Sequence, residues 1–241
     1  MIKLENTVVY GWEAAIRGMR NPMNSWDKSD TKIVHIPELP RLDYAGNVAD
    51  MVPAHYEVRR EMHDEASLGV GPNDLELMKK LVKAGTDHSK FMRMLTVTVD
   101  ITAPLYWWKE FDTYKVGTVR NSCSTMHKIH AKEFELADFS CEHLTSHSTA
   151  LLRDIISELN VCRDNYLKAK DSDGMKPKDW WWQLIQLLPS SYNQRATIQM
   201  NYAMLRNCYH SRRNHKLDEW HRFCDWVEQL AYSELITDKE D

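Results

Sequence analysis

The chain is poor in glycine and has no glycine-rich loop. Only eight of its 241 residues are glycine, and neither a G-x-G-x-x-G run nor a P-loop occurs. Rossmann domains and P-loop proteins hold phosphates with such loops, because glycine lets backbone N–H groups come close to the ligand. The sequence therefore argues against a Rossmann, P-loop or kinase fold.

The chain also lacks a hydrophobic run of membrane-spanning length. A transmembrane helix needs about 18 or more consecutive apolar residues, and the sequence offers none. No charged-then-apolar leader is seen at residues 1–4, so we expect a soluble, intracellular protein of the cytoplasm that does not bind membranes. The formal net charge of −4 argues against a general nucleic-acid surface, which needs a basic face. A local cluster of arginine and lysine remains compatible with an anionic ligand.

Cysteine gives no disulfide or metal-binding pattern. The five cysteines are an odd number, widely spaced, and form no C-x-x-C motif. Such usage is typical of reduced thiols in a cytosolic protein. Large side chains are by contrast abundant, with nine Trp and twelve Met, and they predict a well-filled core.

Hydrophobic periodicity predicts the elements of the N-terminal half. Residues 2–10 fit a first strand, and residues 11–20 fit a short helix that ends before a proline. A helix is expected near residues 73–84, with Asn73 as its N-cap. Residues 95–101 alternate between apolar and polar side chains, which predicts a strand with one buried face.

Residues 25–71 differ from the rest of this half. They contain three prolines, mixed charges and little periodicity. Long irregular segments within a domain are usually insertions or lids. We therefore expect a single domain over residues 1–241, with an insertion or lid at about 25–71 that holds one short helix near 54–66.

The C-terminal half has mostly helical patterns. Apolar residues recur at spacings of three and four, Pro177 stands where a first helical turn tolerates proline, and Ser190 or Ser191 is placed to cap a helix. We expect helices over residues 144–170, from 177, from about 190 to 210 and from 214 to 235. A small antiparallel or mixed sheet packed with this helix-rich half defines an α+β fold.

Two segments resemble a known family. Residues 73–126 run from a helix and a polar loop through the alternating strand to Ala103-Pro104 and an aromatic turn. Residues 184–220 contain Leu188-Pro189, an asparagine twelve residues after the proline, a second six residues later and an arginine five after that, at Asn201, Asn207 and Arg212. Together, these segments of about 90 residues resemble the core of the flavin-dependent thymidylate synthase family.

The resemblance implies two sets of ligand-contacting residues. The cofactor-binding set is His88, Tyr114, Lys115, Asn201 and Asn207. The substrate-binding set is Glu110, Thr118, Arg120, Asn121, Cys123 and Arg212. Amide side chains can pair with the edges of flavin or adenine, and the arginine fork suits a phosphate or a carbonyl edge. Taken alone, each asparagine is also explained as a packing amide.

The polar signature of the family, R-H-R-x-x-S-x-N-E-x-S-x-R-Y, is largely replaced. Aligned on Pro104, its positions are occupied by Thr113, Tyr114, Lys115, Thr118, Arg120, Asn121, Cys123, Thr125 and Met126. Ile185 stands where a further nucleotide-binding arginine is expected. Each lost arginine contact costs about 1–3 kcal/mol, so binding of the original ligands would depend on nearby cations, at Arg93, Lys109, Lys115 and Arg120.

By resemblance, the expected activity is methylation of dUMP or a related one-carbon transfer to a pyrimidine deoxynucleotide. FAD is the implied cofactor, and methylenetetrahydrofolate and NADPH are candidate co-substrates. The family assembles as a homotetramer, so we expect a homo-oligomer. The family reaction needs no protein nucleophile, so no catalytic residue is assigned, and Cys123 is expected to be a small buried residue.

Two alternatives remain open from the sequence. The replaced signature favours a family-derived nucleotide-binding or structural protein without catalysis, whereas Asn201, Asn207 and Arg212 favour a retained site. A metal-dependent hydrolase would use histidine pairs three and four residues apart, at His127 and His130 and at His143 and His147. The aromatic residues between 106 and 114 fit either stacking on a ring ligand or core packing, and packing is favoured.

Overall fold

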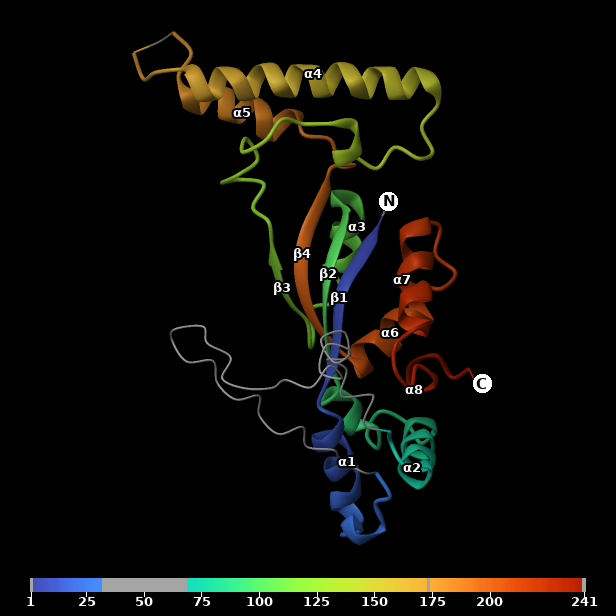
Figure 1. The fold of residues 1–241 in the computed structure, drawn as a ribbon. Helices are drawn as coiled ribbons and strands as arrows, with labels where there is room; N and C mark the ends of the chain where they lie inside the picture. Colours follow the sequence, from blue (N-terminus) through green and yellow to red (C-terminus); the bar gives the residue numbers. More distant parts are fainter. Residues whose placement is uncertain (1, 32–68, 173, 240–241) are drawn as a thin grey trace, which may run out of the picture. The chain divides into compact units, whose positions relative to one another are not determined.

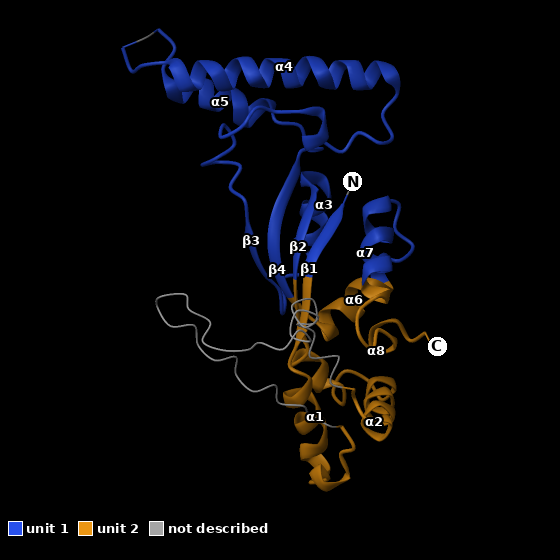
Figure 2. Ribbon diagram, in the orientation of Figure 1, with its two compact units in different colours: residues 1–6, 99–199, 211–226 blue, residues 7–98, 200–210, 227–241 orange. Residues whose placement is uncertain are grey.

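The computed structural model describes residues 2–31, 69–172 and 174–239. These residues form two compact units (Figures 1 and 2). Unit 1 comprises residues 1–6, 99–199 and 211–226, and unit 2 comprises residues 7–98, 200–210 and 227–241. Most of the expected insertion, with its short helix at 54–66, lies outside the described residues, and the single domain stays a prediction.

The elements alternate short strands with helices of varied length. In chain order they are β1 (Lys3–Tyr10), α1 (Trp12–Arg20), η1 (Asn21–Met23), η2 (Trp26–Lys28), α2 (Pro72–Lys83), η5 (Lys90–Arg93), β2 (Thr96–Pro104), α3 (Leu105–Phe111), β3 (Val119–Ser122), η6 (Leu136–Asp138), α4 (Ser146–Lys168), α5 (Pro177–Leu187), β4 (Asn193–Asn201), α6 (Tyr202–Arg212), α7 (Asp218–Glu228) and α8 (Glu234–Thr237). The strands expected at 2–10 and 95–101 and the helices expected at 11–20, 73–84 and 144–170 are confirmed.

The sheet has four strands in the order β1-β2-β4-β3. Strands β3 and β4 pair antiparallel, with Val119 opposite Gln199 and Ser122 opposite Ala196. Every second residue of β2 and β4 is buried, because successive side chains in a strand point to opposite faces. The predicted α+β class, with a small sheet and many helices, is confirmed.

Aromatic side chains fill the core of unit 1 beside the sheet. Trp107 of α3 is fully buried and stacks on Phe111 with ring centroids 5.0 Å apart. It also lies 4.8 Å from the ring of Trp220 in α7. These contacts favour the packing interpretation of the aromatic turn, since such pairs are stabilised by about 0.5–1.5 kcal/mol beyond burial alone.

A second core cluster of unit 1 lies under the paired helices α4 and α5, which run side by side (Figure 1). Its buried residues include Leu152, Leu159 and Leu184. Pro177 occupies the first turn of α5, as predicted. Thr145 caps α4 by accepting a hydrogen bond from the Ser148 N–H at 3.2 Å.

Unit 2 depends on a glycine where β1 ends. Gly11 adopts φ +94°, and a Cβ there would lie 2.1 Å from the Met94 carbonyl oxygen. Only glycine satisfies both the left-handed backbone and the close approach. The turn leads into α1, whose buried Trp12 meets the Tyr202 ring edge-on at 5.6 Å.

The helix expected from about 190 to 210 is wrong over its first half. Residues 193–201 form β4, and the helix α6 begins only at Tyr202. Gln194, Ala196 and Ile198 are buried while the residues between them are exposed, so the backbone follows a period of two. The helix expected from 214 to 235 is also interrupted, because α7 ends at Glu228 and α8 begins at Glu234.

The expected N-cap at Asn73 is corrected as well. Helix α2 begins one residue earlier, at Pro72. The carboxylate of Asp30 accepts hydrogen bonds from the N–H groups of Asn73 (2.9 Å) and Asp74 (3.1 Å). A side chain distant in sequence therefore supplies the cap that the sequence pattern assigned to Asn73.

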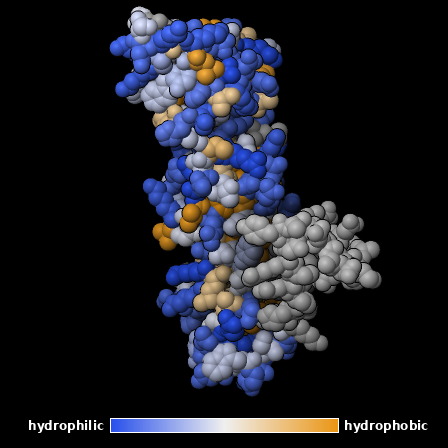
Figure 3. Space-filling view, turned by 60° about the vertical axis from the view of Figure 1, so that its left-hand side comes forward, coloured by the Kyte–Doolittle hydropathy of each residue, from blue (hydrophilic) through white to orange (hydrophobic). Residues whose placement is uncertain are grey.

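Hydrophobic residues are scattered among hydrophilic ones on the face shown in Figure 3. The most exposed large hydrophobic side chain among the described residues is Val116, at 91 %. Within the described ranges, none of the helices combines the length and the apolar character needed to cross a bilayer.

Candidate functional site

Five side chains of unit 1 form a polar group, here called the Glu110 cluster: Glu110, Tyr114, Arg212, His215 and Trp220. Glu110 lies in the last turn of α3, and Tyr114 follows three residues after this helix ends. Arg212 is the final residue of α6, His215 lies in the following turn, and Trp220 is in the first turn of α7. Two segments that are about 100 residues apart in the sequence thus contribute to one cluster.

The carboxylate of Glu110 is hydrogen-bonded unequally through its two oxygens. Its Oε2 lies 3.3 Å from Arg212 Nη1, 3.1 Å from His215 Nε2 and 3.1 Å from Trp220 Nε1. Among the described residues, no donor contacts Oε1. An ionised carboxylate has about four lone-pair directions, so Oε1 retains its capacity to accept hydrogen bonds.

The guanidinium of Arg212 is held by contacts on several sides. Its Nε donates to the Tyr114 hydroxyl at 2.8 Å. The group lies over the rings of Tyr114 and Trp220, at 5.4 and 5.1 Å from their centroids, which is the range of favourable cation–π contacts. Within the part of the chain that the structure describes, Nη2 has no hydrogen-bond partner, so this nitrogen remains available as a donor.

The tautomer of His215 follows from its two contacts. Its Nδ1 accepts a hydrogen bond from the Leu217 N–H at 3.2 Å. This contact places the ring proton on Nε2, which lies 3.1 Å from Glu110 Oε2. His215 thus positions the carboxylate and offers no acceptor of its own to a ligand.

The Glu110 cluster is accessible as well as ordered. The side chains of Glu110, Arg212 and His215 are 35 %, 20 % and 23 % exposed. Glu110 Oε1 and Arg212 Nη2 belong to two partly exposed groups that are joined by the 3.3 Å contact between Nη1 and Oε2, and neither atom has a hydrogen-bond partner among the described residues. Such a pair can recognise a planar polar molecule that carries a donor beside an acceptor.

Other members of the predicted substrate set lie elsewhere in unit 1. Arg120 forms an ion pair with Asp112 at 2.8 Å and stacks over the Trp108 ring at 4.8 Å, so it is already partnered. The hydroxyl of Thr118 is buried and has no hydrogen-bond partner among the described residues. Asn121 on β3 is exposed opposite Thr197.

The expectation that Cys123 is buried is wrong. It is exposed just beyond the end of β3. Its N–H donates to the Arg195 carbonyl at 2.8 Å, and its own carbonyl accepts from Gln194 Nε2 at 2.6 Å. The backbone is therefore fixed by pairing with β4, while the side chain points away from the core.

The predicted cofactor set is divided between the units. Tyr114 and Lys115 belong to unit 1, and the other three, His88, Asn201 and Asn207, belong to unit 2. The Asn201 Oδ1 caps α6 by accepting from the Met204 N–H at 2.9 Å. His88, Lys115 and Asn207 are exposed.

Two members of the Glu110 cluster, His215 and Trp220, were not proposed from the sequence. Both lie within or beside the run from Asn207 to Trp220, which carries the second half of the resemblance. Their spacing from Arg212 gives the only sequence signal. Their partner Glu110 is more than 100 residues away, so the contact itself cannot be read from local spacing.

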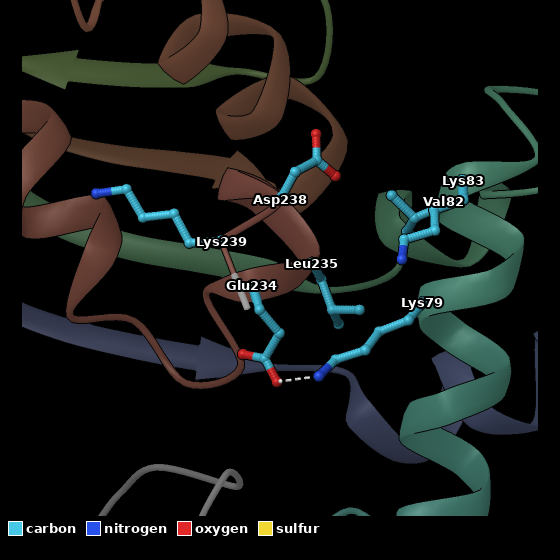
Figure 4. Close-up of a pocket in the computed structure, with 7 residues that line it drawn as sticks. All are labelled: Lys79, Val82, Lys83, Glu234, Leu235, Asp238 and Lys239. Carbon is cyan, nitrogen blue, oxygen red and sulfur yellow. Dashed lines mark ion pairs between the residues drawn. The ribbon is translucent and has the colours of Figure 1, made fainter. Parts of the chain in front are cut away.

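Hollows elsewhere fit a nucleotide poorly. In unit 2, Lys79, Lys83, Glu234 and Asp238 line a cavity of only about 30 Å³, crossed by the Lys79–Glu234 ion pair at 3.4 Å (Figure 4). An open hollow of about 580 Å³ in unit 1 is lined by two carboxylates and one lysine, together with uncharged residues. Its negative charge disfavours a phosphate.

In the described ranges, neither histidine pair belongs to a cluster that could hold a metal ion. Within the described residues, no group of three or more His, Cys, Asp and Glu side chains is placed to hold a metal ion. His143 instead lies 3.1 Å from Asp218 and is 81 % exposed.

The fold itself is that of a known class. No family model matches the sequence, and no curated protein matches it. Solved structures do match over almost the whole chain, two of them at 14 % identity, and at that identity the likeness shows the fold alone. One is the flavin-dependent thymidylate synthase ThyX from Helicobacter pylori complexed with FAD and dUMP, with a TM-score of 0.59, covering 98 % of both chains. The other is ThyX from the same organism with FAD and dUMP, with a TM-score of 0.56, covering 98 % of this chain and 97 % of that one.

Proposed function

We propose that this protein is a flavin-dependent thymidylate synthase-like enzyme that binds a pyrimidine deoxynucleotide at the Glu110 cluster and acts on its ring. The observation that carries this proposal is the ordered, accessible pair of Arg212 Nη2 and Glu110 Oε1. Both residues belong to the substrate set implied by the resemblance. The fold supports it, because the similar structures contain dUMP.

FAD is the cofactor that we propose by resemblance, and each unit, taken by itself, holds predicted side chains whose chemistry fits a flavin. In unit 2 the amide of Asn207 and the imidazole of His88 are exposed, and in unit 1 so is the ammonium of Lys115. Among the described residues, none of these three groups makes a hydrogen bond or an ion pair. The amide nitrogen of Asn201 remains a donor beside its capping oxygen. Such groups match the donors and acceptors on flavin edges. When bound in reduced form, the flavin would supply a hydride.

The replaced signature favours a related one-carbon transfer over ordinary thymidylate synthesis. Arg120 is bound by Asp112, and of the three cationic or histidine positions at 113–115 only Lys115 keeps a charge. Fewer cations are therefore available to hold flavin and folate together. Methylenetetrahydrofolate and NADPH as co-substrates, a homotetrameric assembly and a cytoplasmic location are further parts of this proposal.

The visible absorption spectrum tests the cofactor assignment. We expect flavin bands in the protein after incubation with excess FAD and desalting, and a change in those bands when dUMP or dCMP is added. A protein that stays colourless and binds neither nucleotide would contradict the proposed function.

One observation favours a second candidate, a nucleotide-binding protein without catalysis. Glu110 neutralises the arginine that the resemblance assigns to the nucleotide, and the signature cations are mostly absent. This candidate predicts a colourless protein that still binds a pyrimidine deoxynucleotide in an Arg212-dependent manner.

A further inference from the structure

We propose that the Glu110 cluster selects a cytosine nucleotide, such as dCMP, over the uracil nucleotide dUMP. This inference rests on the proposed function, because it concerns the base that the same site accepts. It is carried by the hydrogen-bonding character of Glu110 and Arg212 and by which of their atoms remain open.

Glu110 presents one acceptor and no donor. Its Oε2 accepts a hydrogen bond from Trp220 and lies within ion-pair distance of Arg212 Nη1 (3.3 Å) and His215 Nε2 (3.1 Å). Only Oε1 is left, and an ionised carboxylate oxygen accepts hydrogen bonds but cannot donate them. A glutamine at this position would also offer an N–H donor, whereas the glutamate offers only an acceptor.

Arg212 presents only donors. Its Nε donates to Tyr114, and its Nη1 faces Glu110 Oε2 at 3.3 Å. The two hydrogens of Nη2 have no acceptor among the residues that the structure describes. The rings of Tyr114 and Trp220 on the guanidinium restrict its reorientation. The cluster therefore offers a ligand the N–H donors of Arg212 Nη2 and one carboxylate acceptor, Glu110 Oε1.

The pyrimidine edges differ in the order of their donors and acceptors. Cytosine carries two acceptors, O2 and N3, followed by the N4 amino donor, and carboxylates accept from cytosine N4 in protein–nucleic acid complexes. Arginine donors facing N3 and O2, with Glu110 Oε1 facing the amino group, satisfy this order. Uracil places its N3–H donor between two carbonyl acceptors.

Uracil therefore fits this edge less well than cytosine. If its N3–H pairs with Glu110 Oε1, Arg212 can reach one carbonyl, and the other carbonyl is left beside the carboxylate. Two acceptors facing each other without a proton repel. A mismatched donor–acceptor pair of this kind lowers affinity roughly tenfold or more.

Calorimetric titration of the protein with dCMP and with dUMP tests the inference. We expect dCMP to bind at least about tenfold more tightly than dUMP. The variant Glu110→Gln should remove or reverse this preference, because the amide supplies the missing donor. Glu76→Gln on α2, which makes the same charge change at an exposed position far along the chain, is the matched control and should keep the preference.

A third ligand makes the test independent of any variant. N4,N4-dimethyl-dCMP has no amino hydrogen, so it should bind the wild-type protein at least about tenfold more weakly than dCMP. Equal binding of these two ligands would overturn the role given to Glu110 Oε1, even if Glu110→Gln does not fold.

The outcomes separate this inference from the proposed function. Equal or tighter binding of dUMP would overturn the cytosine preference and leave the nucleotide site standing. A dCMP preference that survives Glu110→Gln would overturn the assignment to Glu110. Binding of neither nucleotide would overturn the proposed function itself.

Discussion

Two of the arginine–carboxylate pairs, Arg20–Asp74 in unit 2 and Arg212–Glu110 in unit 1, differ in how many hydrogen bonds the carboxylate accepts. Asp74 is fully buried and Arg20 is 5 % exposed, with Asp74 Oδ1 2.6 Å from both Nε and Nη2 of Arg20. The other oxygen, Oδ2, accepts from Ser29 Oγ and from the N–H and hydroxyl of Thr31. Both oxygens of Asp74 thus accept hydrogen bonds, whereas Oε1 of Glu110 has no donor among the residues that the structure describes.

The difference shows how the same pair of charges serves two roles. Burial tends to raise the pKa of Asp74, but hydrogen bonds from Thr31, Ser29 and Arg20 outweigh it, and the pKa is lowered. A buried carboxylate that is fully hydrogen-bonded fixes the local backbone. A half-exposed carboxylate with an open oxygen is ordered by its partners and can still meet a ligand.

Breaking the Arg20–Asp74 pair, in which both carboxylate oxygens accept hydrogen bonds, should have the largest effect on stability. Asp74→Ala leaves Arg20 buried without its counter-charge, which costs about 3–5 kcal/mol. Urea unfolding followed by circular dichroism measures this loss. Glu76→Ala on the same helix removes an exposed ion pair and should leave stability nearly unchanged, because water and salt screen such pairs. Equal losses in the two variants would show that Asp74 is not the anchor described here.

Breaking the Arg212–Glu110 pair should lower the affinity for a nucleotide. Arg212→Ala is expected to weaken binding of dCMP and dUMP by about 2–4 kcal/mol, because a charge-assisted donor to the base is lost. Arg213→Ala, at the exposed neighbouring position, is the control. Affinities that do not change in Arg212→Ala, measured by calorimetry, would count against the site.

Adding a side-chain atom near the Arg20–Asp74 pair should lower stability by a smaller amount. A Cβ on Gly71 would lie 2.2 Å from Asp30 Oδ1 and 2.6 Å from the Asp30 carbonyl carbon. Gly71→Ala must displace the side chain that caps α2, at a cost of about 1–3 kcal/mol. Gly174→Ala, which meets no atom within 4 Å, should be nearly neutral. Differential scanning calorimetry of the two variants decides whether the space around Asp30 is as restricted as the distances imply.

A third carboxylate, Asp100 of β2, should make the stability of the protein depend on pH. Hydrogen bonds from Thr197, Asn6 and Arg195 lower its pKa from 3.8 to about 2. Because the folded pKa is depressed, the stabilisation is present above about pH 4 and is lost as the pH falls towards 2.

Asp100→Asn tests this signature. The variant should be less stable than the wild type by about 1 kcal/mol at neutral pH, since the ion pair with Arg195 lies near the surface. The difference in unfolding free energy should shrink between about pH 4 and pH 2. A difference that stays constant over this range would mean that ionised Asp100 does not contribute in the way stated.

The sequence predicted most of the fold, and its main error has a physical origin. Alternation in β2 was clear because Val97, Val99 and Ile101 are strand-forming residues. In β4 the buried positions are Gln194, Ala196, Ile198 and Met200, and glutamine, alanine and methionine favour helices. Helix propensity therefore masked a period of two that burial in the sheet imposes.

The candidate site was predictable only in part. The resemblance placed Glu110 and Arg212 in the substrate set, yet it could not show that they contact each other. It also could not show that His215 and Trp220 occupy the same oxygen of Glu110. These contacts arise from folding segments that are about 100 residues apart, and no local pattern encodes them.

The two arginines can be compared in a single sample by nuclear magnetic resonance. Arg20 Nε–H donates to Asp74, and Arg212 Nε–H donates to Tyr114, so both resonances should be observable and can be assigned with Arg20→Lys and Arg212→Lys variants. On addition of dCMP we expect the Arg212 resonance to shift to saturation while the Arg20 resonance stays in place. An Arg212 resonance that does not move while calorimetry shows saturated binding would contradict the account.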